Sequence, residues 1–384
     1  MRVLGKGKTA QAIKEVYPQA KLFDDADKDI YDINSSEQTV VSPGIPPHNY
    51  LVENTKTPIS DYDLFLDKDK FTIWISGTNG KTTTTQMIHH LLEEDGFYCG
   101  GNIGTPLAEI SKEGKLILET SSFTLHYTNI VKPNIYILLP ISDDHLSWHG
   151  TFEEYEQSKL KPLLMMDEND IAIIPAKYKD ILTKAKLFTY EDSDELCSLF
   201  NIEKEKIKFN EPFLLDSLLA LSVAKIVNLN LDYEKINTFK VDEHKVEEFK
   251  DHLNRVWVDD SKATNVDATI WALKGYKDKK INLILGGDDK GADLNPLFKE
   301  LQKYNVELFN IGANENRLKE LSEKFSINFN SCENLENAVK KIAQIAQKND
   351  VSILSPAAAS FDQFDSYKQR GEKFKNFVNE LRIV

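Results

Sequence analysis

Short apolar runs, each followed directly by a polar segment, recur along this chain. They constrain its fold more than any other feature. The runs occupy residues 71–75, 116–118, 135–139, 256–258, 281–285 and 351–354, and helical patterns lie between them. Short runs of this kind predict buried strands, and strands that alternate with helices predict parallel sheets with crossover helices. We therefore expect an α/β fold.

The segments that follow these runs are polar, glycine-rich or charged. In chain order they read SGTNGKTTTT, ETSSF, PISDDH, DDSKATN, GGDDKGAD and SPAAASFDQF. In an open parallel sheet, ligands bind beyond the carboxyl ends of the strands. Among them, these six segments carry carboxylate side chains and groups suited to binding phosphate. Together they predict a shared ligand cleft.

The length of 384 residues exceeds what one ordinary hydrophobic core occupies, which suggests two or three domains. A polar stretch at 61–70 and a charged stretch at 240–245 are the candidate boundaries. We therefore expect a small domain at 1–70, a central domain at 71–241 and a C-terminal domain at 242–384.

The charge balance excludes several classes of function. The net charge is -14, from 47 basic and 61 acidic residues, and such a surface repels nucleic acid. Cys99, Cys197 and Cys332 lie far apart, so they predict neither a metal site nor a disulfide framework. The N-terminal segment MRVLGKGKTAQ has no apolar signal core, and no apolar run reaches membrane-spanning length. We expect a cytoplasmic monomer without a membrane partner.

The segment GTNGKT, at residues 77–82, predicts a phosphate site between a strand and a helix. Glycines let successive backbone N–H groups face an anion, and the helix adds its positive dipole end. Lys81 would reach the β- and γ-phosphates, and the Thr82 hydroxyl would bind Mg²⁺. Only two residues separate Gly77 from the GK pair, where the common pattern has four, so a chance glycine turn is the alternative. The residues expected to contact ATP here are Gly77, Thr78, Asn79, Gly80, Lys81, Thr82 and Thr83.

A second glycine loop, Gly5-Lys6-Gly7, follows a short apolar run at the N-terminus. It is similar to a dinucleotide fingerprint without the third glycine, and a plain strand–helix turn is an equal alternative. Asp24 and Asp25 follow the next apolar run, where a carboxylate often meets a ribose. Two solvated surface acids are the alternative there.

Candidate Mg²⁺ ligands follow two further strands, because this ion prefers hard oxygen ligands. Glu119 follows one predicted strand, and Asp143, Asp144 and His145 follow the next. Lys159 lies on a helix that opens with Thr151 and Glu154, a capping-box spacing. A helical lysine is usually solvated, so its position alone gives Lys159 no role.

The ordered set of motifs resembles the Mur ligase family, and within it the branch that adds D-glutamate. The match runs from about residue 2 to the C-terminus, and DSKATN, GGDDK and SPAAASFDQF are its most specific parts. Its motifs are SPGI (42–45), GTNGKT, GNIGTP (101–106), ETSSF, DDH, YEQSK (155–159), DDSKATN, GGDDKGAD and SPAAASFDQFDSYKQRG.

The resemblance implies three domains: a Rossmann-like N-terminal domain that binds the uridine nucleotide, a central P-loop-type ATPase with a parallel sheet, and a Rossmann-like C-terminal domain. It implies an ATP-dependent ligase that joins D-glutamate to UDP-N-acetylmuramoyl-L-alanine in peptidoglycan precursor synthesis. ATP and two Mg²⁺ ions are the implied cofactors. An acyl phosphate would form first, and the amine of D-glutamate would then displace phosphate.

The resemblance also implies site residues. Lys81, Glu119, His145 and Lys159 would be catalytic. The metal ligands would be Thr82, Glu119, His145 and a carbamylated Lys159. Lys245 and Asp260 would serve ATP. The UDP-sugar contacts would be Gly5, Thr9, Asp24, Asp25, Ser42, Asn102 and His145. The D-glutamate contacts would be Lys262, Thr264, Lys290, Ser360 and Tyr367.

The sequence departs from the family pattern at several positions. Lys245 replaces the arginine of an HR pair, which keeps the charge but loses the bidentate fork. An asparagine pair near the adenine falls on Phe213 and Asp216, and Tyr367 stands where phenylalanine is usual. The N-terminal domain is also short, so recognition of both nucleotide bases is left open.

Three alternative functions stand beside this interpretation. One is another ligase of the same family, of the Mur or folylpolyglutamate type. The second is a nicotinamide-dependent oxidoreductase, suggested by Gly5 and Gly7, which leaves GTNGKT unexplained. The third is a nucleotide-binding protein without catalytic activity.

Overall fold

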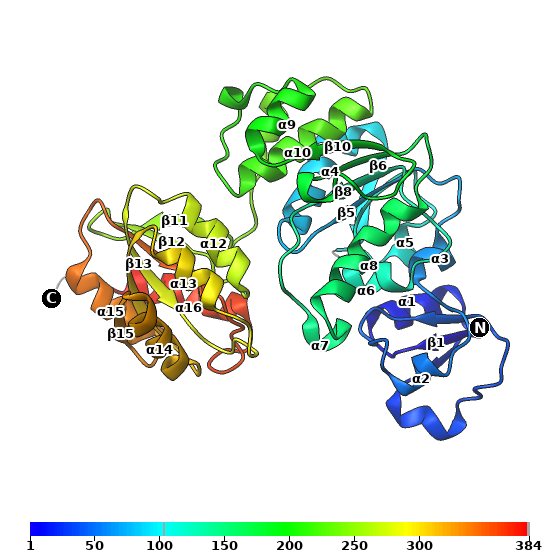
Figure 1. The fold of residues 1–384 in the computed structure, drawn as a ribbon, viewed down its shortest axis with the longest axis horizontal. Coiled ribbons are helices and arrows are strands. Elements are labelled where there is room, and N and C mark those ends of the chain that lie inside the picture. The colour runs from blue at the N-terminus through cyan, green and yellow to red at the C-terminus, as the bar shows by residue number, and fades with distance from the viewer. Residues whose placement is uncertain (103, 382–384) are drawn as a thin grey trace. The chain divides into compact units, whose positions relative to one another are not determined.

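The computed structural model describes residues 1–102 and 104–381. The described residues form two compact units: one lies within 1–209 and 213–239, and the other within 210–212 and 240–381 (Figure 1). Within the described residues, every helix is too short or too polar to cross a membrane. The expected α/β architecture is confirmed in both units.

The first unit begins with a parallel four-stranded sheet in the order β2-β1-β3-β4. Its apolar residues divide between the two faces: Leu4 and Val41 pack on one face, and Val3 and Val40 on the other. The elements are β1 (Arg2–Leu4), α1 (Lys8–Val16), β2 (Lys21–Phe23), the 3-10 helix η1 (Asp25–Ile30), β3 (Thr39–Val41), α2 (Tyr50–Glu53), β4 (Pro58–Ile59) and α3 (Asp61–Phe65).

A parallel six-stranded sheet in the order β10-β9-β8-β5-β7-β6 follows in the same unit. Its strands are β5 (Thr72–Ser76), β6 (Phe97–Gly101), β7 (Lys115–Glu119), β8 (Ile135–Leu138), β9 (Ile171–Pro175) and β10 (Lys186–Tyr190). Its helices are α4 (Lys81–Leu92), α5 (Leu107–Ile110), α6 (Ser122–Tyr127), α7 (Leu146–His149), α8 (Phe152–Met165), α9 (Ser193–Phe200), α10 (Phe213–Ile226) and α11 (Tyr233–Thr238), with 3-10 helices η2 (Glu93–Asp95), η3 (Ala176–Tyr178) and η4 (Lys204–Lys206).

Helices cover both faces of this central sheet. Successive strand residues point to opposite faces, so Ile73 and Ile75 of β5 pack with α4 and α10, whereas Trp74 packs with α3, α5, α6 and α8. All five residues of β5 are buried, as expected for a parallel strand with helices on both faces. The central position of β5 places the segment after it at the middle of the carboxyl edge.

The second unit holds a six-stranded sheet in the order β11-β12-β16-β13-β14-β15, in which β11 is antiparallel and the others are parallel. Its strands are β11 (Glu247–Lys250), β12 (Val256–Asp259), β13 (Lys280–Leu285), β14 (Asn305–Asn310), β15 (Asn328–Ser331) and β16 (Val351–Leu354). Its helices are α12 (Val266–Lys274), α13 (Asn295–Leu301), α14 (Glu315–Phe325), α15 (Leu335–Ile345) and α16 (Tyr367–Asn379). Helices α12, α13 and α14 pack on one face, and α15 and α16 on the other.

All six strands predicted from the sequence are confirmed, with ends that differ by at most one residue. The expected helix after the phosphate segment begins at Lys81, and Gly96 ends the following turn with a left-handed backbone. The three sheets occupy residues 2–59, 72–190 and 247–354. The division into three domains, with boundaries at 70 and 241, stays a prediction, because the chain divides into two compact units.

The core of the second unit gives a direct test of the fold. Phe298 of α13 is fully buried, whereas Phe361 is 70% exposed. We expect Phe298→Ala to lower the free energy of unfolding of this unit by about 3–5 kcal/mol, because it removes buried apolar surface and leaves a cavity. Phe361→Ala is the control, and we expect a change within about 0.5 kcal/mol. Urea denaturation of both variants measures the difference, and equal losses would contradict the placement of α13.

Candidate active site

The segment after β5 forms a glycine turn that leads into α4. Gly77 has φ 135°, and a Cβ there would lie 2.5 Å from the Cβ of Leu139. Gly80, with φ 83°, is the N-cap of α4, so the first backbone N–H groups of a twelve-residue helix adjoin the turn. The Lys81 Nζ donates to the carbonyl oxygens of Gly77 (3.0 Å) and Thr78 (2.6 Å). This arrangement of amides, helix N-terminus and ammonium group suits a phosphate.

Glu119, at the end of β7, lies against this turn because β7 pairs with β5. Its carboxylate is 2% exposed; Oε2 accepts a hydrogen bond from Thr82 Oγ1 at 2.8 Å, and Oε1 accepts one from Asn102 Nδ2 at 2.9 Å. The structure therefore brings together three residues that the sequence placed in the site by separate motifs. Ile103, also in the GNIGTP segment, lies outside the described residues.

Lys159 is buried beneath the phosphate turn, unlike the usual solvated helical lysine, and the role that the family resemblance implies for it stays a prediction. Its side chain is 1% exposed, its Nζ donates to the Gly77 carbonyl oxygen at 2.7 Å, and it lies 4.7 Å from the centre of the Tyr155 ring. Burial, and then the nearby charge of Lys81, lower the pKa of the Lys159 ammonium well below its ordinary value.

The spacing of the buried residues in α8 accounts for the burial of Lys159. The buried residues of α8 are Tyr155, Ser158, Lys159, Pro162 and Leu163, which follow the spacing of one helix face. The expected cap at its start is present, since the Thr151 hydroxyl accepts from the Glu154 N–H at 3.2 Å. A periodicity count over 155–163 would have placed Lys159 on the inner face.

His145 lies at the start of α7 with a left-handed backbone (φ 55°) and is 47% exposed. Its Nε2 is 3.6 Å from Asp144 Oδ2, and its ring is 6.1 Å from that of Tyr155, one turn before Lys159 in α8. His149, the last residue of α7, is buried and its Nε2 lies 2.9 Å from Ser122 Oγ. Burial lowers the pKa of His149 to about 3, so this imidazole is neutral at physiological pH.

Two of the predicted UDP-sugar residues, Thr9 and Asn102, line a cavity of about 260 Å³. Gly5 has φ 107°, and a Cβ there would lie 2.9 Å from Ser42 Oγ, so the ends of β1 and β3 are closely packed. The other lining residues of the cavity are Lys8, Ala12, Ile13, Pro43, Asp61, Tyr62, Phe65, Gly101, Gly104, Pro106, Leu107, Ala108 and Thr124.

Asp24 and Asp25 already have partners within the N-terminal sheet region. Asp24 caps η1 and pairs with Lys6 at 3.0 Å. Asp25 accepts from Asn49 Nδ2 at 2.9 Å. A ribose contact by either carboxylate stays a prediction.

Asp216, one of the departures from the family pattern, lies against the phosphate turn. It is 3% exposed, and its Oδ1 accepts from Thr84 Oγ1 at 2.7 Å. A Cβ on Gly80 would lie 2.7 Å from the same oxygen. Phe213 begins α10 and packs against the core shared with α4. The structure thus gives Asp216 a role in holding α4 to α10.

In the second unit, the residues predicted to contact ATP lie next to the first two strands of the sheet. Lys245 precedes β11, and Asp260 follows β12. The Lys245 Nζ lies 2.9 Å from Asp242 Oδ2. Asp260 is buried, and it accepts from the Val246 N–H (3.2 Å) and the Ser355 hydroxyl (2.7 Å). Burial raises the pKa of Asp260 to about 8.

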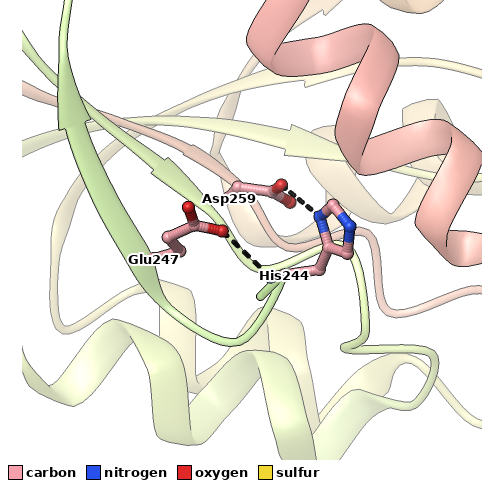
Figure 2. A group of neighbouring side chains, drawn as sticks. All are labelled: His244, Glu247 and Asp259. Carbon is pink, nitrogen blue, oxygen red and sulfur yellow. Dashed lines mark hydrogen bonds and ion pairs between the residues drawn. The ribbon is translucent and has the colours of Figure 1, made fainter. Parts of the chain in front are cut away.

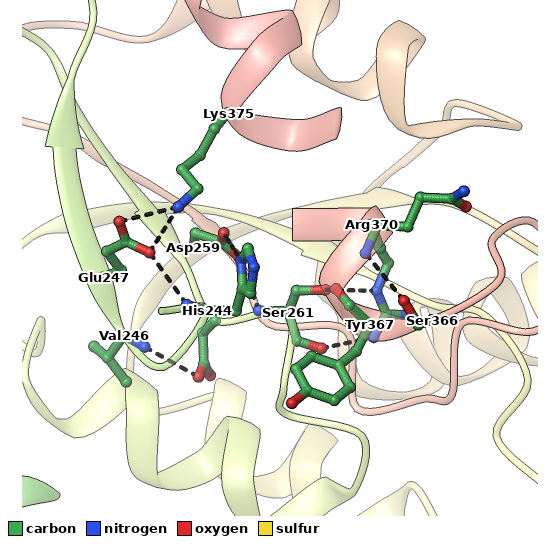
Figure 3. Close-up of polar contacts among 11 residues, drawn as sticks. His244, Val246, Glu247, Asp259, Ser261, Ser366, Tyr367, Arg370 and Lys375 are labelled. Atoms are coloured by element: carbon green, nitrogen blue, oxygen red, sulfur yellow. Dashed lines mark hydrogen bonds and ion pairs between the residues drawn. The ribbon is translucent and has the colours of Figure 1, made fainter. Parts of the chain in front are cut away.

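Three side chains of the second unit lie close enough to one another to hold a cation: His244, Glu247 and Asp259 (Figure 2). The His244 Nδ1 is 2.6 Å from Asp259 Oδ2, and the His244 N–H donates to Glu247 Oε2 at 3.1 Å. The Lys375 Nζ lies 2.9 and 3.0 Å from the two Glu247 oxygens (Figure 3). Lysine therefore supplies the positive charge, and this group is a structural link between β11, β12 and α16.

Four of the five residues predicted to bind D-glutamate lie in the loops after three neighbouring strands, β12, β16 and β13. The fifth, Tyr367, is the first residue of α16. Lys262 Nζ lies 5.6 Å from the centre of the Tyr367 ring. Ser360 is buried, whereas Thr264 and Lys290 are exposed. Asp288 and Ala359 exchange backbone hydrogen bonds of 2.8 and 3.0 Å, which connects the loops after β13 and β16.

Comparison with known families agrees with this architecture. Residues 75–216 match the Mur ligase middle domain, and residues 246–358 match the Mur ligase glutamate ligase domain. The first match spans the central sheet, and the second spans the sheet of the second unit.

Relatives of similar length carry one name. The chain is 51% identical over 352 residues to a UDP-N-acetylmuramoylalanine–D-glutamate ligase of Campylobacter jejuni strain 81-176, covering 91% of this chain and 88% of the relative. It is 44% identical over 416 residues to the protein of that name from Helicobacter pylori strain J99, covering 98% of each chain.

Solved structures show the same fold at low sequence identity. The MurF ligase of Thermotoga maritima in complex with ADP has a TM-score of 0.61 at 17% identity, covering 98% of this chain and 93% of that one. The UDP-N-acetylmuramate–alanine ligase MurC of Thermotoga maritima has a TM-score of 0.57 at 15% identity, covering 98% of each chain. Together with the matched domains and the close relatives, they show that this chain belongs to the Mur ligase family.

Proposed function

We propose that the chain is an ATP-dependent ligase that adds D-glutamate to UDP-N-acetylmuramoyl-L-alanine in the synthesis of peptidoglycan precursors. The observation that carries the proposal is the buried Glu119 carboxylate, bonded to Thr82 at the start of the helix that follows the phosphate turn. The relatives named for this activity are 44–51% identical over most of the chain, which favours D-glutamate addition over the other family activities.

The reaction has to activate a carboxylate, because oxide is a poor leaving group. A carboxylate oxygen of the UDP-sugar attacks the γ-phosphorus of ATP, and ADP leaves. The amine of D-glutamate, after losing a proton, attacks the acyl carbon, and phosphate leaves. Lys81 and the amides of 77–82 stabilise the charge that develops on the phosphoryl oxygens.

The oxygen groups at the phosphate turn suit Mg²⁺, since a buried carboxylate and a hydroxyl converge there at 2.8 Å. Thr82 and Glu119 would hold one ion, and His145 with a modified Lys159 would hold a second. When bound, Mg²⁺ neutralises charge on the phosphate oxygens.

Burial prepares Lys159 for carbamylation. Its lowered pKa favours the neutral amine, which can attack the carbon of CO₂. A carbamate forms and one proton is released, so the buried cation becomes an anionic oxygen ligand. Its nearness to the Gly77 carbonyl oxygen puts the product beside the phosphate turn.

The remaining roles follow the matched motifs. Lys262 and Lys290 would pair with the carboxylates of D-glutamate. The other D-glutamate contacts would be Thr264, Ser360 and Tyr367, and Lys245 and Asp260 would serve ATP. Gly5, Thr9, Asp24, Asp25, Ser42, Asn102 and His145 would contact the UDP-sugar. We further propose three domains, a cytoplasmic location and a monomeric state.

The substrate requirement tests the activity directly. We expect ADP and phosphate release only when ATP, UDP-N-acetylmuramoyl-L-alanine and D-glutamate are all present. Omitting each in turn, and replacing D-glutamate by L-alanine, L-lysine, diaminopimelate or L-glutamate, separates this function from the other family activities. Turnover with one of the replacements and not with D-glutamate would sink the proposal, and nucleotide binding without turnover would favour a non-catalytic protein.

Two substitutions test the phosphate turn and its acid. We expect Lys81→Ala and Glu119→Ala each to abolish ADP release, because Lys81 would stabilise the charge on the phosphoryl oxygens directly and Glu119 would hold the Mg²⁺ that neutralises it. Lys115→Ala, at the exposed amino end of β7, is the control and should retain wild-type turnover. Normal turnover in the Lys81 or Glu119 variant would refute the role of that residue.

A rescue experiment tests the carbamate. We expect Lys159→Ala to lose activity and to regain part of it with a short-chain carboxylate such as acetate, which supplies the missing anionic oxygens. Lys161→Ala is the matched control: it lies two residues on in α8, and its Nζ donates to His126 and Asn129 instead. Full activity of Lys159→Ala without any carboxylate would remove the proposed role.

A further inference from the structure

Arg370, the fourth residue of α16, is a buried guanidinium that the sequence analysis did not single out. It is 1% exposed. Its Nε donates to Ser261 Oγ at 2.9 Å, and its Nη2 donates to the Ser261 carbonyl oxygen at 2.8 Å. Both Nη atoms donate to the Ala358 carbonyl oxygen at 3.1 Å, and Figure 3 shows the side chain directed toward Ser261.

These acceptors are all uncharged. Within residues 1–102 and 104–381, Arg370 has no ion-pair partner, in contrast to the buried Arg255, whose Nε lies 2.7 Å from Asp251 Oδ2. Burial lowers the pKa of Arg370 to about 10, so the group remains a cation at physiological pH. The carboxylates of Asp362, Asp259 and Asp260 favour its charged form electrostatically, but among the described residues none of them forms an ion pair with it, so the bonds of the guanidinium all go to loop oxygens.

The contacts of Arg370 join loops that carry predicted D-glutamate residues. Ser261 directly precedes Lys262 in the loop after β12, and Ala358 lies two residues before Ser360 in the loop after β16. The Ser261 hydroxyl that accepts from Arg370 also donates to the carbonyl oxygen of Tyr367 at 2.8 Å. One guanidinium therefore ties together three segments of the candidate site.

The loop that carries Lys290 is connected to the same group. A Cβ on Gly287 would lie 3.5 Å from Arg370 Nη1, so this loop packs directly on the guanidinium. Its next residue, Asp288, exchanges backbone hydrogen bonds with Ala359, the neighbour of Ala358. Moving Arg370 would thus disturb the loops after β12, β13 and β16 at once.

We propose that Arg370 is a positioning residue for D-glutamate: its planar fork fixes the relative placement of Lys262, Lys290, Ser360 and Tyr367. The proposal rests on the proposed function and adds to it a residue that acts through others. A lysine at 370 would keep the charge but could not bond Ser261 and Ala358 in the same plane.

The test compares Arg370→Lys with Arg255→Lys in the full chain. Arg255, 6% exposed, lies at the amino end of β12 and serves as the matched control. For Arg370→Lys we expect the KM for D-glutamate to rise about tenfold or more, while the KM values for ATP and the UDP-sugar change less than about twofold, since misplaced positioning groups weaken one substrate's binding selectively. For Arg255→Lys we expect a lower melting temperature and an unchanged KM for D-glutamate.

Ser261→Ala keeps the test decisive if Arg370→Lys does not fold. This variant removes one acceptor of Arg370 and the bond to Tyr367, and we expect a smaller rise of the D-glutamate KM in the same direction. The proposal would be overturned by a wild-type KM for D-glutamate in Arg370→Lys or, if that variant does not fold, in Ser261→Ala. An equal rise of the KM values for all three substrates would also overturn it. Wild-type protein without D-glutamate-dependent ADP release would instead overturn the proposed function.

Discussion

The hydrogen bond between Thr82 Oγ1 and Glu119 Oε2 is the contact on which the candidate site depends. It joins the helix that follows the phosphate turn to the carboxylate at the end of the neighbouring strand. The parallel pairing of β5 with β7, in which Ile75 lies opposite Glu119, makes that contact possible. Because the sheet is buried on both faces, the register of these strands is strongly fixed, and the site inherits the rigidity of the core.

Space around the phosphate turn is as restricted as its hydrogen bonding. The close approaches of Leu139 to Gly77 and of Asp216 to Gly80 leave no room for a side chain at either glycine. Asp216 also holds Thr84, so α10 supports the first turns of α4 from behind. The residue that departs from the family's asparagine pattern thus has a structural function here. Recognition of adenine by a residue at this position would have to coexist with the bond to Thr84.

The sequence predicted the elements well and the burial of individual polar groups less well. All six apolar runs became strands, because continuous apolar runs between helical segments have few other solutions in a large α/β protein. The convergence of Thr82 and Glu119 could be expected from motifs at two strand ends, whereas Asn102 was expected only through the family resemblance, as a UDP-sugar contact. The residues alone place Lys159 on the inner face of α8 only when the periodicity of its neighbours is counted, whereas the family resemblance already implied a site role for it. Arg370 lies within the motif at 355–371, but its burial could not be predicted, since its partners are two backbone carbonyls and a hydroxyl from loops more than 10 residues away in sequence.

Lys159 and Arg370 show how two buried cations with carbonyl partners can serve different ends. Neither forms an ion pair among the described residues, and both donate to main-chain oxygens beside a candidate site. Burial lowers the pKa of each, but the consequences differ because lysine can lose its proton in a protein and arginine keeps it. A neutral amine beneath the phosphate turn can react with CO₂ and become an anionic ligand. A guanidinium stays charged and planar, so it suits the task of holding several loops in one arrangement. Under the proposed function, the lysine of the first unit supplies a reactive group and the arginine of the second unit supplies a fixed one.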